Sequence, residues 1–262
     1  MDSELTLPLD VLLHIIKLLA AAGNDRDSIK SLQILSQTCK YMVPICRKHL
    51  FSSLRLRSKS ISKRFSNLLL ENPEIAHYVT SLSHYVDRVY YSDRISSELI
   101  ILNILKVRSP LQWIELSCSP AVDWNDYPES IRLSLLSLIG LPTVTLLDIN
   151  SFKGFPATAL SGCTNLINLW LTRIELTLPD SEFNHVISRS KIPTPAFLNI
   201  SATNGFAALL NSASLHAGAS GPINFSCVQV AYLEVDSQGD IDNINKLIKL
   251  TRQLQYIDIT SE

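Results

Sequence analysis

The chain has 262 residues, of which 46% are hydrophobic and 18% are charged, and its formal net charge is −1. This composition is typical of a globular protein and excludes a disordered one, and the length allows one or two domains. A net charge near zero provides no overall field that would attract nucleic acid.

The first predicted helix begins at Leu7-Pro8, because proline suits the first helical position. Asp10 follows in the first turn, where the helix dipole favours an anion. Val11, Leu12, Ile15, Ile16 and Leu19 then recur at helical spacing. Two more amphipathic stretches follow, from Ser28 and from Tyr41. Three such short helices bury little surface, so we expect them to be stable mainly against something else.

This stretch, roughly residues 5–54, resembles an F-box. The resemblance rests on Leu7-Pro8, the acidic Asp10, the aliphatic helix that follows and the Cys39-Lys40-Tyr41 patch. An Ala-rich loop insertion and Tyr41 in place of tryptophan depart from the family pattern. The resemblance implies a three-helix F-box over residues 1–54 that docks on the Skp-type adaptor and through it on a cullin. The adaptor contacts that it implies are Leu7, Pro8, Val11, Leu12, Ile15, Ile16 and Leu19.

Positive charge is concentrated just after the first helix. Residues 28–70 contain no acidic side chain, and the basic side chains in this segment, here called the basic collar, are Lys30, Lys40, Arg47, Lys48, Arg55, Arg57, Lys59, Lys63 and Arg64. A solvated positive face is the expected role, and an acidic adaptor surface is an alternative partner. Phosphate contact is also possible for such side chains, but few aromatics interleave with them, so we do not expect nucleic acid as a partner.

The next segment, residues 55–74, is predicted to be a basic linker or a first repeat cap. It overlaps a short strand over 54–57 and contains a helix over 58–70. Beyond it, an apolar-x-x-apolar-x-apolar pattern recurs with its middle position at residues 82, 114, 147, 169, 198, 233 and 257. Helices are predicted between the copies, over 97–107, 130–138, 183–188, 205–215 and 241–250.

One strand and one helix per irregular unit resembles a divergent leucine-rich repeat. The predicted fold class is therefore α/β: an N-terminal three-helix F-box followed by an irregular leucine-rich-repeat-like solenoid over residues 75–262, with a parallel sheet on its concave side. The alternative is that these are ordinary strands of an α/β domain. The chain stops directly after a predicted strand, so we expect either an incomplete chain or a protected last edge.

The pattern also predicts which side chains lie on the concave face. The residues before the middle positions form one column, and those after them form a second. Aromatic rings and carboxylates recur there, and such side chains form binding faces that select basic partners. The predicted binding residues for a protein substrate with a basic segment are Trp113, Glu115, Asp148, Trp170, Phe197, Tyr232, Glu234, Tyr256 and Asp258. The alternative is that helices or loops cover this face and the aromatics belong to the core.

No linear signature of catalysis is present. The chain has neither a Gly-rich phosphate loop nor a G-x-S-x-G motif, and its cysteines and histidines lack metal-ligand spacing. We therefore expect no cofactor, no metal and no enzymatic activity. An α/β enzyme assembled around Cys163 or His185 is the remaining alternative.

The location expected from the sequence is the cytoplasm or the nucleus. An acidic leader with Asp2 and Glu4 argues against a signal peptide, and five cysteines without a C-x-x-C pair suit reduced thiols. The uncharged stretch 192–233 is broken by prolines and glycines, so no membrane span is expected.

Together with the resemblance, these features predict a substrate-recognition subunit of an SCF-type cullin–RING E3 ubiquitin ligase. An F-box-like interaction protein without a ligase role is the alternative.

Overall fold

A computed structural model describes residues 8–21, 26–38, 40–86, 92–177, 192–201, 205–215, 222–235 and 238–261. It confirms the predicted α/β class: helices accompany an eight-stranded sheet in which every strand pair is parallel. The helix predicted over 183–188 lies outside the described residues. Within the described ranges, no helix is long and apolar enough to cross a membrane.

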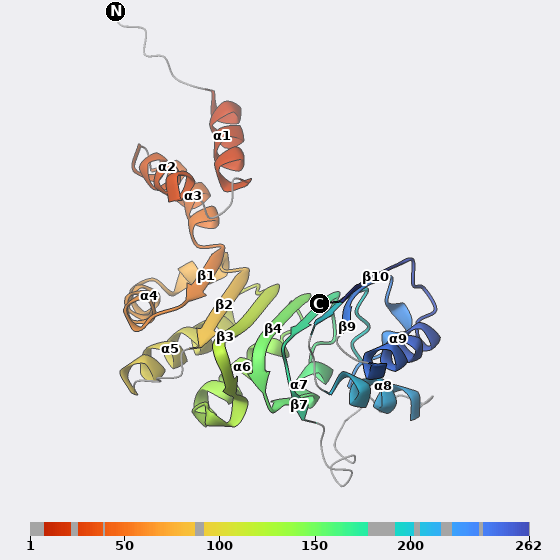
Figure 1. Ribbon diagram of the computed structural model, residues 1–262. Helices are drawn as coiled ribbons and strands as arrows, with labels where there is room; N and C mark the ends of the chain where they lie inside the picture. The colour runs from red at the N-terminus through yellow and green to blue at the C-terminus, as the bar shows by residue number, and fades with distance from the viewer. Residues whose placement is uncertain are drawn as a thin grey trace, which may run out of the picture.

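Three helices at the N-terminus have a hydrophobic core of their own. They are α1 (Leu9–Ala21), α2 (Arg26–Thr38) and α3 (Met42–Leu50). Ile16, Leu32, Met42 and Cys46 form the buried centre of this N-terminal core. Figure 1 shows the three helices standing apart from the sheet and joined to it at β1. The boundary is sharp, because Leu50 packs on the N-terminal core whereas Phe51 packs on the core of the sheet.

The strands of the large sheet follow one another in chain order. The order across the sheet is β1 (Ser53–Leu56), β2 (Ser81–Val86), β3 (Trp113–Asp123), β4 (Leu146–Lys153), β6 (Asn168–Thr172), β8 (Phe197–Ser201), β9 (Val230–Val235) and β10 (Tyr256–Ser261). Two short strands, β5 (Phe155–Pro156) and β7 (Leu176–Thr177), form a separate parallel pair. Parallel neighbours need a crossover, and helices supply most of the crossovers here.

The longer helices gather along one side of the sheet (Figure 1). They are α4 (Lys59–Glu71), α5 (Ser92–Arg108), α6 (Glu129–Ile139), α8 (Phe206–Leu215) and α9 (Gln238–Leu250). The chain also forms shorter helical turns, η1 (Pro73–Tyr78), η2 (Trp124–Asp126), α7 (Thr158–Ser161) and η4 (Phe225–Cys227). Ser58 caps α4 by accepting a hydrogen bond from the Ile61 N–H at 3.4 Å, as its position before the apolar run favours.

The recurring apolar pattern builds one continuous core between the helices and the sheet. In the copy at β3, Leu111, Ile114 and Leu116 are fully buried, while the residues between them alternate to the other side of the sheet. The same core continues from Leu54 in β1 to Leu247 in α9. Phe51, Leu54 and Leu56 form a further copy of the pattern, which the sequence reading treated only as a strand.

The structure corrects the predicted register of β9. Ala231, not Leu233, pairs with both Leu198 and Ile257, so the copy in this strand is Val228-x-x-Ala231-x-Leu233. All three of these residues are buried. A small alanine does not mark a middle apolar position, so the sequence pattern predicts this register two residues too far along the strand. Because the shift is two residues, Tyr232, Leu233 and Glu234 keep their predicted faces, whereas Val230, an inward position of the predicted copy, lies on the opposite face.

An aromatic cluster extends the core where β3 and β4 run beyond the repeated pattern. The Trp124 ring lies 5.8 Å from that of Tyr127 and 4.9 Å from that of Phe155, measured between centroids, and Phe152 packs on the same tryptophan. All four side chains are buried. These residues fall outside the six-residue pattern, so the pattern does not predict that they are buried.

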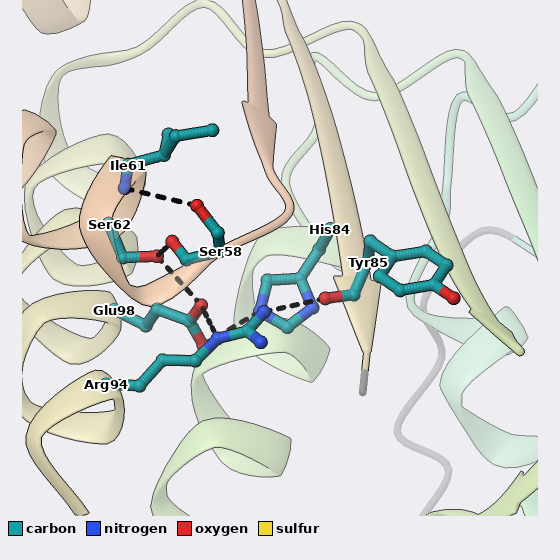
Figure 2. Close-up of polar contacts among 7 residues, drawn as sticks. All are labelled: Ser58, Ile61, Ser62, His84, Tyr85, Arg94 and Glu98. Atoms are coloured by element: carbon teal, nitrogen blue, oxygen red, sulfur yellow. Dashed lines mark hydrogen bonds and ion pairs between the residues drawn. The ribbon is translucent and has the colours of Figure 1, made fainter. Parts of the chain in front are cut away.

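One buried position of the pattern is polar. In β2 the third apolar site is His84, which is fully buried, and its Nε2 donates to Oε2 of Glu98 on α5 at 3.1 Å. Arg94 Nε donates to Glu98 Oε1 at 2.7 Å, and Ser62 Oγ on α4 donates to the same oxygen at 3.0 Å. Figure 2 shows this cluster between β2, α4 and α5. Hydrogen bonding therefore replaces apolar packing at this one site and ties the three elements together.

Burial alone would oppose ionisation of Glu98, because a charged carboxylate loses its hydration. The hydrogen bonds and charges of His84 and Arg94 outweigh that cost and lower the pKa of Glu98 to about 2. A second bond of Arg94, from Nη2 to the carbonyl oxygen of Tyr85 at 2.7 Å, fixes the guanidinium against the end of β2. The cluster is thus a structural element of the core.

Candidate functional site: the outer face of the sheet

The sheet face opposite the core residues, here called the outer face, carries side chains in columns set by the parallel register. One column comprises Ser53, Ser81, Trp113, Leu146, Asn168, Phe197, Val230 and Tyr256. The adjacent column comprises Arg55, Ser83, Glu115, Asp148, Trp170, Asn199, Tyr232 and Asp258. The corrected register of β9 moves Tyr232 from the first column to the second and moves Glu234 one step further along the strand.

Five large aromatic side chains on the outer face are exposed to solvent. Their exposed fractions range from 36% for Trp170 to 51% for Tyr256, with Trp113, Phe197 and Tyr232 between these values. The Tyr232 and Tyr256 rings lie 5.9 Å apart between centroids on neighbouring strands. The aromatics are therefore not part of the core, and they present apolar area that a partner could cover at low entropic cost.

Two carboxylates lie side by side near the tryptophans. Glu115 on β3 and Asp148 on β4 occupy paired positions, and Asp148 pairs in turn with Trp170 on β6. Matched positions on neighbouring strands are about 4.8 Å apart in the backbone. Partial burial, reinforced by the nearby Glu115 carboxylate, raises the pKa of Asp148 to about 6. Among the residues that the structure describes, neither carboxylate forms a salt bridge, although two adjacent carboxylates favour a nearby cation.

The other two predicted acids differ from each other in their surroundings. Glu234 accepts a hydrogen bond from the Ser201 hydroxyl on β8, which holds its carboxylate against the sheet. Asp258 on β10 is partly exposed and pairs across the strands with Tyr232. Along the sheet, Trp113, Glu115, Asp148 and Trp170 lie on β3, β4 and β6, and the other five predicted residues, Phe197, Tyr232, Glu234, Tyr256 and Asp258, lie on β8, β9 and β10.

The structure separates the predicted adaptor contacts into core and surface residues. Ile16 is buried, and Leu12 and Leu19 pack against the N-terminal core. Pro8 and Val11 are exposed, Ile15 is half-buried, and Leu7 lies outside the described residues. These helices also expose the apolar residues Leu9, Leu18, Ile34 and Tyr41. The sequence pattern does not distinguish such exposed apolar residues from the buried ones.

The side chains of the basic collar are all exposed. Those of α4 lie beside a depression of about 410 Å³ that is lined by Ile61, Arg64, Phe65 and Leu68.

Cys163, the candidate nucleophile of the alternative enzyme, is fully buried, and burial raises the pKa of its thiol to about 12. His185 lies outside the described residues. Within the described ranges, no group of three or more His, Cys, Asp or Glu side chains could hold a metal ion.

Comparisons with known proteins add no relative to this picture: no protein-family model, curated protein or solved structure matches the chain.

Proposed function

We propose that the chain is a non-catalytic receptor subunit of an SCF-type cullin–RING ubiquitin ligase. In this proposal the N-terminal helices act as an F-box on the Skp-type adaptor, and the outer face of the sheet binds a protein substrate. The observation that carries the substrate half is the row of exposed aromatics beside an unneutralised carboxylate pair. A receptor of this kind needs no active site, because it acts by raising the local concentration of substrate near the conjugating enzyme.

The separate N-terminal core supports the adaptor half. A small helical unit that keeps Leu9, Val11 and Leu18 exposed has apolar area left for a partner after its own core is filled. Chain-order parallel strands with helices along one side support the leucine-rich-repeat-like interpretation of the sheet.

The basic segment of a substrate is the ligand that the outer face favours. Its guanidinium or ammonium groups would neutralise Glu115 and Asp148 and lower the cost of holding the two carboxylates together. Trp113 lies two residues before Glu115 on β3, and Trp170 pairs with Asp148 on the neighbouring strand. A cation bound at the carboxylates can therefore also interact with the face of a tryptophan ring.

Co-expression with a Skp-type adaptor tests the adaptor half. Surface substitutions Leu9→Asp and Val11→Asp together should abolish co-purification, because they place charge on the exposed side of α1 and leave Ile16 in the core. The matched control is Leu133→Asp, an exposed apolar residue of α6, which should leave co-purification unchanged. Failure of the intact chain to bind the adaptor would refute the ligase role.

Two alternatives make different predictions for adaptor co-purification and for the binding of a basic peptide. An F-box-like interaction protein without a ligase role would bind a basic peptide on the outer face but no adaptor. An α/β enzyme would depend on neither surface.

A further inference from the structure

The first helix of the helix layer leaves one side uncovered. Helix α4 packs against α5 and the short helix η1, and Figure 1 places it at the margin of the layer. Ser62, Ser66 and Leu69 fill its buried face. Ile61, Phe65 and Leu68 follow one another at helical spacing on a neighbouring face and line the 410 Å³ depression together with Arg64.

Apolar and positive side chains meet at this depression. Ile61 is 42% exposed, whereas Phe65 and Leu68 contact the main core and form the floor. Lys59, Lys63 and Arg64 are exposed on the same helix, and its only acid is Glu71 in the last turn. The absence of acids from residues 28–70 extends this positive environment beyond α4.

We propose that this α4 groove is a docking site for an acidic amphipathic helix of a partner protein. A helix placed there would lie along α4, and its apolar residues would cover Ile61, Phe65 and Leu68. Its carboxylates would meet Arg64, Lys63 and Lys59, which sets the charge of the partner. This inference does not depend on the proposed ligase role.

The apolar lining favours a peptide over nucleic acid. Phosphate contacts need exposed cations but gain nothing from Ile61 and Leu68, and the depression offers a base one ring, the partly buried Phe65. A second copy of the chain is disfavoured because the same positive collar would face itself across the interface.

Fluorescence anisotropy on the full chain tests the proposal with a labelled synthetic peptide of about 18 residues, long enough to form a helix on binding. The peptide carries Leu on one helical face and Glu on the other. One comparison peptide replaces Glu with Lys, a second replaces Leu with Ser, and an oligothymidine of similar length represents nucleic acid. We expect the acidic peptide to bind and the three other probes to bind at least about tenfold more weakly.

Variants locate the binding. Ile61→Ser and Arg64→Glu should each weaken peptide binding by about tenfold, since each removes a central contact of the groove. Leu70→Ser, an exposed apolar position on the same helix, and Lys153→Glu, an exposed cation of β4, are the matched controls and should change the affinity by less than about twofold. Far-ultraviolet circular dichroism verifies that all four variants remain folded.

Several results would overturn the proposal. They are no binding of the acidic peptide, equal binding of the Lys peptide or of oligothymidine, and unchanged affinity in Ile61→Ser and Arg64→Glu. Self-association of the wild-type chain that Ile61→Ser abolishes would assign the groove to a second copy and would equally contradict it.

Discussion

Glu115 and Asp148 occupy paired positions on neighbouring parallel strands, and the pKa of Asp148 is raised to about 6 as a result of partial burial and of the Glu115 carboxylate. At neutral pH Asp148 is therefore ionised at a cost to the folded state. A ligand cation would reduce that cost, so ligand binding and proton binding compete at this position.

Binding of a basic ligand should depend on pH in the direction that this pKa sets. A labelled Arg-rich peptide should bind weakly at pH 5, where Asp148 is mostly protonated, and more tightly as the pH rises through about 6. Anisotropy titrations from pH 5 to 8 measure this. Asp148→Asn should weaken the binding at pH 8 and flatten the profile. An equally steep profile in that variant would assign the titration to another group.

The stability of the fold should show the opposite trend in the same region. Because the pKa of Asp148 is higher in the folded chain than its ordinary value of 3.8, the native state binds more protons than the unfolded state between these values. The free energy of unfolding should therefore fall as the pH rises from about 4 to about 6 and then level off. After allowance for solvent screening, Asp148→Asn should raise the free energy of unfolding at pH 7 by about 1 kcal/mol, measured by urea titration.

Charge reversal tests the choice of partner. Glu115→Lys with Asp148→Lys should weaken binding of the basic peptide by about tenfold or more and change the free energy of unfolding by less than about 1 kcal/mol. Asp126→Lys with Glu129→Lys, two exposed acids near the start of α6, is the matched control and should bind like the wild type. Wild-type affinity in the first double variant would remove the carboxylate pair from the binding site.

The buried cluster around Glu98 predicts a large loss of stability on truncation. Glu98→Ala leaves Arg94 and His84 buried without their shared carboxylate, and it should lower the free energy of unfolding by about 3–5 kcal/mol. Glu71→Ala, an exposed acid at the end of α4, should cost less than about 0.5 kcal/mol. Chemical denaturation of both variants compares their free energies of unfolding.

Because the pKa of Glu98 is lowered to about 2, its stabilising contribution should be lost as the pH falls from about 4.5 to about 2.

The two cores should unfold as separable units. All three tryptophans, Trp113, Trp124 and Trp170, lie in the sheet part of the chain, so their fluorescence reports unfolding of that part alone. Ile16→Asp places a charge in the N-terminal core and should reduce the helical signal at 222 nm without shifting the fluorescence transition. Val11→Asp, at an exposed position of α1, should change neither signal. A lowered fluorescence midpoint in Ile16→Asp would show that the two parts are coupled.

The periodic parts of this fold were predictable, because strand and helix periods depend on local residue order. The six-residue pattern gave the α/β class, and period-two alternation placed Trp113 and Glu115 on one face. The helix predicted over 58–70 corresponds to α4, and Ser58 is its cap. The F-box and solenoid interpretations stay predictions.

Features that depend on contacts distant in sequence were not predictable. His84 interrupts the apolar pattern, and only its contact with Glu98 on the following helix explains why it can be buried. The register of β9 was wrong because Ala231 is too small to mark an apolar position by itself. In α1 the polar Asp10, His14 and Lys17 mark one narrow face and apolar residues cover the rest, so periodicity alone could not separate the buried Ile16 from the exposed Val11.

Leu50 and Phe51 are neighbours in the chain, yet they pack on different cores. Except where α3 contacts η1, substitutions in one core therefore need little compensation in the other. The peptide bond between Leu50 and Phe51 marks where the helices could be exchanged as a unit for those of another protein. In evolutionary terms, the two cores could then diversify at different rates within one chain.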